Sequence, residues 1–245
     1  MPRKRNLFDP KSSTPYALSR SKVELFRDCH RCFYLDRRLG ISRPPGFPFN
    51  LNSAVDTLLK NEFDQYRLSE SQHPYLVENG ISAIPVSHPD LETWRKNFTG
   101  IRVLHESSGF EAFGAIDDLW RCLKTNRYIV VDYKATSKAS EVSLDADWQI
   151  SYKRQMEFYQ WLLRRRGLDV DNTGYFVYAN GIRDNKTFDN RLEFRVKVIP
   201  YEGDDDWVEQ TLIDANAVLS DDEIPEPDNG CAYCSYVGEV SAAGA

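Results

Sequence analysis

The sequence predicts an α/β fold, because segments with strand character alternate along the chain with segments of helical periodicity. The strand segments are rich in aromatic and β-branched residues, which favour sheets. They span residues 110–121, 128–134, 173–180 and 192–199. The helical segments span about residues 21–39, 52–66, 148–163 and 207–219. At 245 residues, 41% of them hydrophobic, the chain is long enough to bury one substantial core.

Two aspartates and a lysine occupy the first two strand segments. Asp117 ends the run Gly114-Ala115-Ile116-Asp117, and Asp132-Tyr133-Lys134 begins 15 residues after it. Two carboxylates can share a divalent cation, which neutralises a phosphate and lowers the pKa of a bound water. The lysine can orient or deprotonate that water. The pattern therefore indicates phosphodiester hydrolysis, although taken alone it also fits an ordinary charged surface hairpin.

These two strand segments are predicted to form a β-hairpin, since the stretch between them, residues 124–127, is polar. With an even-length loop, Asp117 would face Lys134. Because side chains alternate along a strand, Asp117, Asp132 and Lys134 would then share one face of the sheet. An odd-length loop would place Asp118 on that face instead.

The helix predicted over residues 148–163 carries a glutamine and a tyrosine one turn apart, Gln155 and Tyr159. Residues at this spacing can point toward the same neighbour. The arginines at 164–166 and Gly167 suit the end of this helix, where cations favour the dipole and glycine caps the last turn.

Four of the five cysteines form two C-x-x-C pairs, Cys29 with Cys32 and Cys231 with Cys234. Paired cysteines far apart in sequence are typical of metal sites, and four thiolates can bind zinc or an iron–sulfur cluster. Nothing marks the chain as secreted, so structural disulfides are not expected. The alternative is that these are coincidental core cysteines. Cys122 is predicted to be an ordinary strand residue.

In their order along the chain, these motifs resemble the PD-(D/E)XK nuclease superfamily, and within it the RecB-like group and CRISPR-associated exonucleases. That group carries G-x-[IV]-D on one strand, D-x-K on the next and Q-x-x-x-Y on the following helix. The resemblance favours Asp117 over Asp118. It implies a restriction-endonuclease-like core, in which helices flank a mixed central sheet. An N-terminal helical segment and a C-terminal cysteine loop would pack beside this core.

The resemblance also implies a metal site for magnesium or manganese. Asp117 and Asp132 would hold the ion, with the carbonyl of Tyr133 as a third ligand. Many RecB-like proteins place a metal-binding histidine where this chain has Asp56. An aspartate can ligate magnesium, which prefers oxygen, so Asp56 is a further candidate ligand. The alternative is that Asp56 is a solvent-facing helix residue.

The remaining roles come from the same resemblance. Lys134 would position the attacking water, and Gln155 would orient Lys134 or the substrate. Tyr159 would contact the DNA backbone or brace its helix. These roles imply a metal-dependent deoxyribonuclease, an exonuclease that leaves a 5′-phosphate. The alternative is a catalytically silent nucleic-acid-binding module on the same fold.

For the four cysteines, the resemblance implies a [4Fe–4S] cluster, whereas the spacing by itself favours zinc. Related exonucleases place one cysteine near the N-terminus and three near the C-terminus, but this chain has two and two. Either metal would tie the first helix to the C-terminal loop and contribute free energy of folding.

Composition and charge bound the remaining expectations. With 31 basic and 37 acidic residues the net charge is −6, and no apolar run approaches the roughly 20 residues that span a membrane. We therefore expect a cytoplasmic protein with no membrane partner. Its expected partners are DNA, as single strands or duplex ends, and a helicase or another recombination or CRISPR protein. Residues 1–18 are predicted to be flexible, and residues 19–245 to form a single nuclease-like domain.

Overall fold

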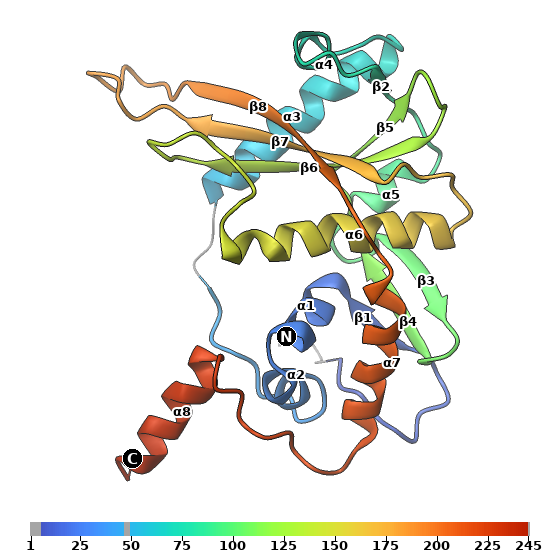
Figure 1. Cartoon of the computed structure of the whole chain (residues 1–245), viewed down its shortest axis with the longest axis vertical. Helices are drawn as coiled ribbons and strands as arrows, with labels where there is room; N and C mark the ends of the chain where they lie inside the picture. Colours follow the sequence, from blue (N-terminus) through green and yellow to red (C-terminus); the bar gives the residue numbers. More distant parts are fainter. Residues whose placement is uncertain (1–5, 47–49, 245) are drawn as a thin grey trace. The chain divides into compact units, whose positions relative to one another are not determined.

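A computed structural model describes residues 6–46 and 50–244 of the chain. The chain divides into two compact units, each assembled from separated segments (Figure 1). Unit 1 consists of Met1–Phe47, Arg102–Phe113 and Asp206–Ala245, and unit 2 consists of Pro48–Ile101 and Gly114–Asp205. The sequence predicts one domain over residues 19–245. The structure has two compact units in that range, and their joint action as one nuclease-like domain stays a prediction.

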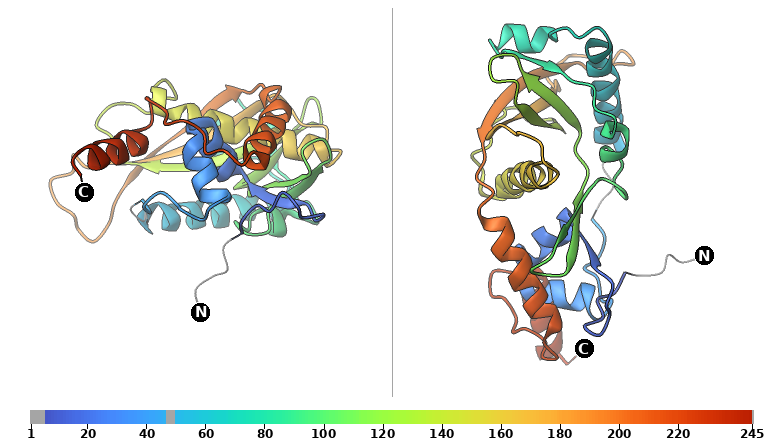
Figure 2. Two further views of the ribbon diagram at one scale, coloured as in Figure 1. Left: turned by 90° about the horizontal axis from the view of Figure 1, so that it is seen from below. Right: turned by 90° about the vertical axis from the view of Figure 1, so that its right-hand side faces the viewer.

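Unit 2 is built on a five-stranded mixed sheet in the order β2-β5-β6-β7-β8. Its strands are β2 (Ala83–Pro85), β5 (Asp118–Cys122), β6 (Tyr128–Thr136), β7 (Thr173–Gly181) and β8 (Phe194–Glu202). Strands β6 and β7 are parallel and the other neighbours are antiparallel. The sheet is curled, as the right-hand view of Figure 2 shows. This mixed sheet with flanking helices confirms the predicted fold class.

Helices lie on both faces of that sheet. They are α3 (Asn50–Leu68), α4 (Pro74–Glu78), α5 (Leu91–Trp94) and α6 (Ile150–Arg165), and a short 3₁₀ helix, η1 (Asp147–Gln149), precedes α6. Leu59 and Phe63 of α3 pack into one buried cluster with Trp120 and Tyr133 of the sheet. Helix α6 covers the opposite face, as the views of Figures 1 and 2 agree.

The prediction of one long strand over residues 110–121 is wrong. The chain forms β4 (Phe110–Gly114) and β5, which belong to different sheets, with Ala115–Asp117 between them. A close backbone contact lies at the end of β4. A Cβ atom at Gly100 would be 2.3 Å from the carbonyl oxygen of Gly114, and Gly100 has a φ of +53°. Only glycine fits this position without strain.

The observed hairpin register differs from the expected one by two residues. Each side chain therefore stays on the face of the sheet that was expected for it. Strands β5 and β6 pair with Asp118 opposite Val131 and Leu119 opposite Val130. Continuing the same register places Asp117 opposite Asp132 instead of Lys134. Because the shift is even, Asp117 and Asp132 still share a face, and Asp118 points to the other one.

Unit 1 contains the chain's second sheet, in the order β1-β4-β3, with β1 parallel to β4. Its further strands are β1 (Tyr16–Ser19) and β3 (Ile101–His105). Its helices are α1 (Arg20–Asp28), α2 (His30–Arg37), α7 (Trp207–Ser220) and α8 (Ala232–Ala242). None of the helices among the described residues combines the length and the apolar run that crossing a bilayer requires.

Three expectations for unit 1 need correction. The single helix over residues 21–39 is two helices, because Cys29 is extended, with φ −167° and ψ 113°. The C-terminal cysteine loop is the start of α8, which Cys231 precedes and which contains Cys234. The segment 6–18 is structured, since Phe8 is buried and β1 begins at Tyr16. Residues 1–5 of the segment expected to be flexible lie outside the described residues.

Candidate functional site

The position of Asp117 is fixed from two sides in unit 2. On one side, the Tyr133 backbone N–H of β6 donates to Asp117 Oδ2 at 2.9 Å. On the other, Arg95 Nε donates to the Asp117 carbonyl oxygen at 3.0 Å, and the Ile116 N–H donates to the Trp94 carbonyl at 3.2 Å. The Asp117 carboxylate therefore lies against β6, beside Asp132.

Asp132, Lys134 and Gln155 form one polar cluster between β6 and α6. Lys134 Nζ makes an ion pair with Asp132 Oδ2 and lies 3.4 Å from Gln155 Oε1. Gln155 Nε2 donates to Asp132 Oδ1 at 2.9 Å and to the Tyr159 hydroxyl at 3.1 Å. The Lys134 ammonium also lies 4.5 Å from the centre of the Tyr152 ring. The Gln155 amide thus contacts both Asp132 and Lys134 of the D-x-K motif. The hydroxyl of buried Tyr159 accepts a hydrogen bond from the same amide.

A second lysine, Lys60 of α3, lies between two of the candidate metal ligands. Its ammonium is 2.8 Å from Asp56 Oδ2 and 3.1 Å from Asp117 Oδ1. Burial and the nearby Asp117 carboxylate raise the pKa of Asp56. Burial opposes the charged form of Lys60, but Asp117 and Asp56 raise its pKa overall. A cation already balances these two carboxylates, so this place suits positive charge.

Behind the site, Asp118 is fully buried and accepts hydrogen bonds from both arginines of this region. Arg67 of α3 contacts Asp118 Oδ1, and Arg95 Nη2 donates to the same oxygen at 2.8 Å. The Tyr133 hydroxyl and the Trp120 indole donate to Oδ2 at 2.7 and 3.1 Å. Burial and Asp118 raise the pKa of Tyr133 well above its usual value. A buried carboxylate with this many donors is stable and rigid.

The sequence motifs do not include Lys60, Arg67 or Arg95, although the sequence carries a signal for two of them. Lys60 follows Asp56 by four residues, the spacing of a helical ion pair. Arg67 continues the apolar four-residue spacing of Leu59 and Phe63 and is buried with them. An arginine in such a stripe indicates a buried acidic partner. Arg95 follows a four-residue helix and carries no comparable pattern.

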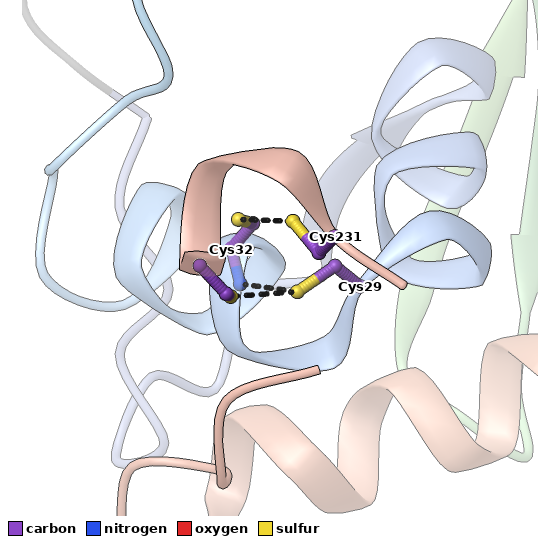
Figure 3. A group of neighbouring side chains, drawn as sticks. Cys29, Cys32 and Cys231 are labelled. Atoms are coloured by element: carbon purple, nitrogen blue, oxygen red, sulfur yellow. Dashed lines mark hydrogen bonds between the residues drawn. The ribbon is translucent and has the colours of Figure 1, made fainter. Parts of the chain in front are cut away.

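In unit 1, the four predicted cysteines come together. The sulfur of Cys29 is 3.6 Å from that of Cys234, and the sulfur of Cys32 is 3.6 Å from that of Cys231. All four sulfurs lie within 4.8 Å of one another. Figure 3 shows the sulfurs of Cys29, Cys32 and Cys231 turned toward one another. The fifth cysteine, Cys122, is in unit 2, on β5.

The break between α1 and α2 creates half of this cluster. Extended Cys29 caps α2, and its sulfur accepts the Cys32 N–H at 3.4 Å. Arg43 Nη2 donates to the sulfur of Cys231 at 3.4 Å. Burial raises the pKa of Cys32 to about 12. Burial also opposes ionisation of Cys231, but hydrogen bonds, first among them from the Cys234 backbone, lower its pKa to about 7.

A family model of the PD-(D/E)XK nuclease superfamily matches residues 42–238. The chain belongs to this superfamily. A search of curated proteins found no match to the chain. The curled mixed sheet and its flanking helices are consistent with the core of the superfamily, whose members are generally nucleases that use a divalent metal.

The acidic residues of unit 2 match such an ion in the chemistry of their donor atoms. Asp56, Asp117 and Asp132 provide the oxygen donors that magnesium and manganese prefer. The Lys60 ammonium, held by two of them, marks a place where positive charge is already bound. Ligation by Asp56, Asp117, Asp132 and the Tyr133 carbonyl stays a prediction, as do the predicted roles of Lys134, Gln155 and Tyr159.

A divalent cation shared with Asp117 must compete with the Lys60 ammonium. Replacing Lys60 by Gln removes that competitor and a positive charge close to the ion. We expect Lys60→Gln to bind Mn²⁺ about tenfold more tightly than the wild type, since a like charge within about 4–6 Å shifts ionic equilibria by one or more powers of ten. Isothermal titration calorimetry measures the affinity.

Two further variants serve as controls for this titration. Lys96→Gln removes an exposed lysine of unit 2 and should bind Mn²⁺ like the wild type. Asp117→Asn should lose binding. Equal or weaker Mn²⁺ affinity in Lys60→Gln would show that Lys60 and the ion do not compete for the same place.

Proposed function

We propose that the protein is a metal-dependent DNA nuclease, an exonuclease of the RecB-like group. The observation that carries the proposal is the cluster of Asp117, Asp132, Lys134 and Gln155 on the core of a PD-(D/E)XK protein. The register of β5 and β6 places Asp117 opposite Asp132, and Lys134, two residues after Asp132, pairs with it. This arrangement suits hydrolysis of a phosphodiester. The negative charge of the phosphate must be neutralised on one side, and water must attack the phosphorus from the other.

In this mechanism, each side chain has a distinct task. Asp117 and Asp132 would hold the divalent cation, which would neutralise charge on the phosphate and lower the pKa of a bound water. Lys134 holds the attacking water in line with the phosphorus and stabilises negative charge on the phosphoryl oxygens. Gln155 keeps the Lys134 ammonium in place through its amide oxygen, and Tyr159 fixes the Gln155 amide. The expected product carries a 5′-phosphate.

The setting of this reaction is a finer proposal that rests on the motif resemblance. We propose that the substrate is DNA with single strands or duplex ends, and that the reaction serves repair, recombination or the processing of mobile elements. A helicase or another recombination or CRISPR protein is the proposed partner. We also propose a cytoplasmic location, where reduced cysteines stay available to a metal.

For the four-cysteine site, we propose zinc. A tetrahedral ion with Zn–S bonds of about 2.3 Å requires sulfurs about 3.8 Å apart. The two close sulfur pairs, at 3.6 Å, and the common limit of 4.8 Å fit one ion. A [4Fe–4S] cluster binds each thiolate through a different iron, which requires wider separation. The geometry therefore favours the ion that the two-plus-two spacing suggests.

A catalytically silent nucleic-acid-binding module is the second candidate, and one observation favours it. Lys60 bridges Asp56 and Asp117, so an intramolecular cation already occupies part of the place that a metal would use. Asp56 also replaces the histidine expected from the resemblance. In this function, the lysine is a permanent substitute for the ion, and the protein binds DNA without cutting it.

The nuclease function predicts a large effect of removing Lys134. Cleavage of end-labelled single- and double-stranded DNA with Mg²⁺ or Mn²⁺ should fall by about 10²- to 10³-fold in Lys134→Ala, the loss that follows removal of one positioned donor to developing negative charge. The matched control, Lys197→Ala, removes a lysine of β8 paired with Glu141 and should cut like the wild type. Circular dichroism should show both variants folded. Undiminished turnover in Lys134→Ala would contradict the assignment.

The zinc site predicts the metal content of the protein. Protein purified without oxygen should contain one zinc per chain and lack the visible absorbance of an iron–sulfur cluster. Cys29→Ser should lose this zinc and melt at a lower temperature, because structural zinc contributes folding free energy. Cys122→Ser, which alters the cysteine outside the cluster, should keep it. Iron with acid-labile sulfide in the purified protein would instead establish the cluster.

A further inference from the structure

A hollow of about 470 Å³ lies in unit 2, at the carboxyl end of β6. Its volume is within the range of pockets that hold small ligands. The walls come from α3, η1, α6 and the sheet, and they are mostly aromatic or aliphatic. The largest of these side chains are Leu51, Trp148, Tyr152, Tyr178, Leu192 and Phe194. None of the functional groups described above explains this apolar surface.

The hollow adjoins the candidate active site. A smaller hollow of about 100 Å³ is lined by Asp56 and Lys134, among others. The two hollows share four wall residues, which are Asn52, Val55, Ala135 and Tyr152. The Tyr152 ring, whose centre is 4.5 Å from the Lys134 ammonium, belongs to this shared wall. A ligand held at Lys134 can therefore extend into the larger hollow.

Positive charge lies beside the aromatic walls of this hollow. Trp148 is 53% exposed, although a tryptophan side chain is usually well buried. It meets Tyr152 edge to face, with ring centres 5.3 Å apart. The ammonium of Lys138 lies 5.2 Å from the centre of the Trp148 ring. An apolar protein segment would not use the two lysines, Lys134 and Lys138, whereas a nucleotide would use both kinds of surface.

We propose that this hollow binds an unstacked nucleobase of the strand that is cut, next to the scissile phosphate. This inference rests on the proposed nuclease function and adds the residues that would select a single strand or a frayed end, Trp148 and Tyr152. A base inside a duplex has both faces covered by its neighbours, so it cannot stack on Trp148 or Tyr152. Base stacking on aromatic side chains tolerates any sequence, so the subsite selects strandedness.

The first test measures binding without added divalent metal, by fluorescence anisotropy of labelled oligonucleotides. Trp148→Ala should bind a single strand about tenfold more weakly than the wild type and bind a blunt duplex equally well. Trp148→Phe keeps an aromatic face and should restore most of the affinity. Phe98→Ala, which removes another exposed aromatic residue of unit 2, should bind like the wild type. Unchanged single-strand affinity in Trp148→Ala would overturn the proposal.

The second test locates the base. An abasic nucleotide is moved through a single-stranded substrate one position at a time, and the cleavage rate is measured. With the abasic nucleotide at one position beside the cut, the cleavage rate of the wild type should fall about tenfold. At that position, the abasic nucleotide should not reduce the cleavage rate of Trp148→Ala any further. If the abasic nucleotide slows Trp148→Ala by the same factor as the wild type at every position, the proposal is overturned.

The two tests separate this subsite from the nuclease function. If the wild type cuts no DNA but Trp148→Ala still binds single strands more weakly, the subsite stands and the nuclease assignment falls. If the wild type cuts DNA and Trp148→Ala binds and cuts single strands normally, the nuclease assignment stands and the subsite falls.

Discussion

The geometry of unit 2 depends on a ring of two carboxylates and two guanidinium groups, in which Asp118 is fully buried and Asp64 is partly exposed. Asp118 binds both Arg67 and Arg95, and Asp64 binds the same two arginines at 2.9 and 2.8 Å. The ring joins α3, β5 and the residue that follows α5, and the Tyr133 hydroxyl extends it to β6. Removing one partner from such a buried pair costs about 3–5 kcal/mol, because the other charge stays desolvated. The ring therefore fixes the frame on which the neighbouring Asp117 lies.

On that frame, two lysines pair with three carboxylates. Lys60 reaches Asp56 and Asp117 from α3, whereas Lys134 pairs with Asp132 and is held by Gln155 from α6. The two lysines therefore have different tasks in the proposed reaction. Lys134 stays beside the phosphate, while Lys60 must yield its place to the incoming ion. The cysteine site lies in unit 1, where a bound metal would stabilise the fold of that unit.

Periodicity in the sequence predicts which residues share a face of one strand or one turn of a helix. The alternation of strand residues places Asp117 and Asp132 on one face, and the helical spacing puts Gln155 and Tyr159 on one turn. The sequence does not predict partners that are chosen in three dimensions, such as Arg95 for the Asp118 carboxylate. The break at Cys29 also escapes periodicity, because the buried residues Phe26, Cys29 and Phe33 keep helical spacing across it. A capping sulfur and a cysteine cluster assembled from distant segments determine that break.

The central claim is that Asp117 and Asp132 share a divalent cation. Crystals of the protein soaked in Mn²⁺ test it most directly, because the anomalous scattering of manganese locates the ion. We expect a peak within about 2.5 Å of carboxylate oxygens of both aspartates, with the Lys60 ammonium moved away from Asp117. Absence of that peak, with Lys60 still bridging Asp56 and Asp117, would contradict the account.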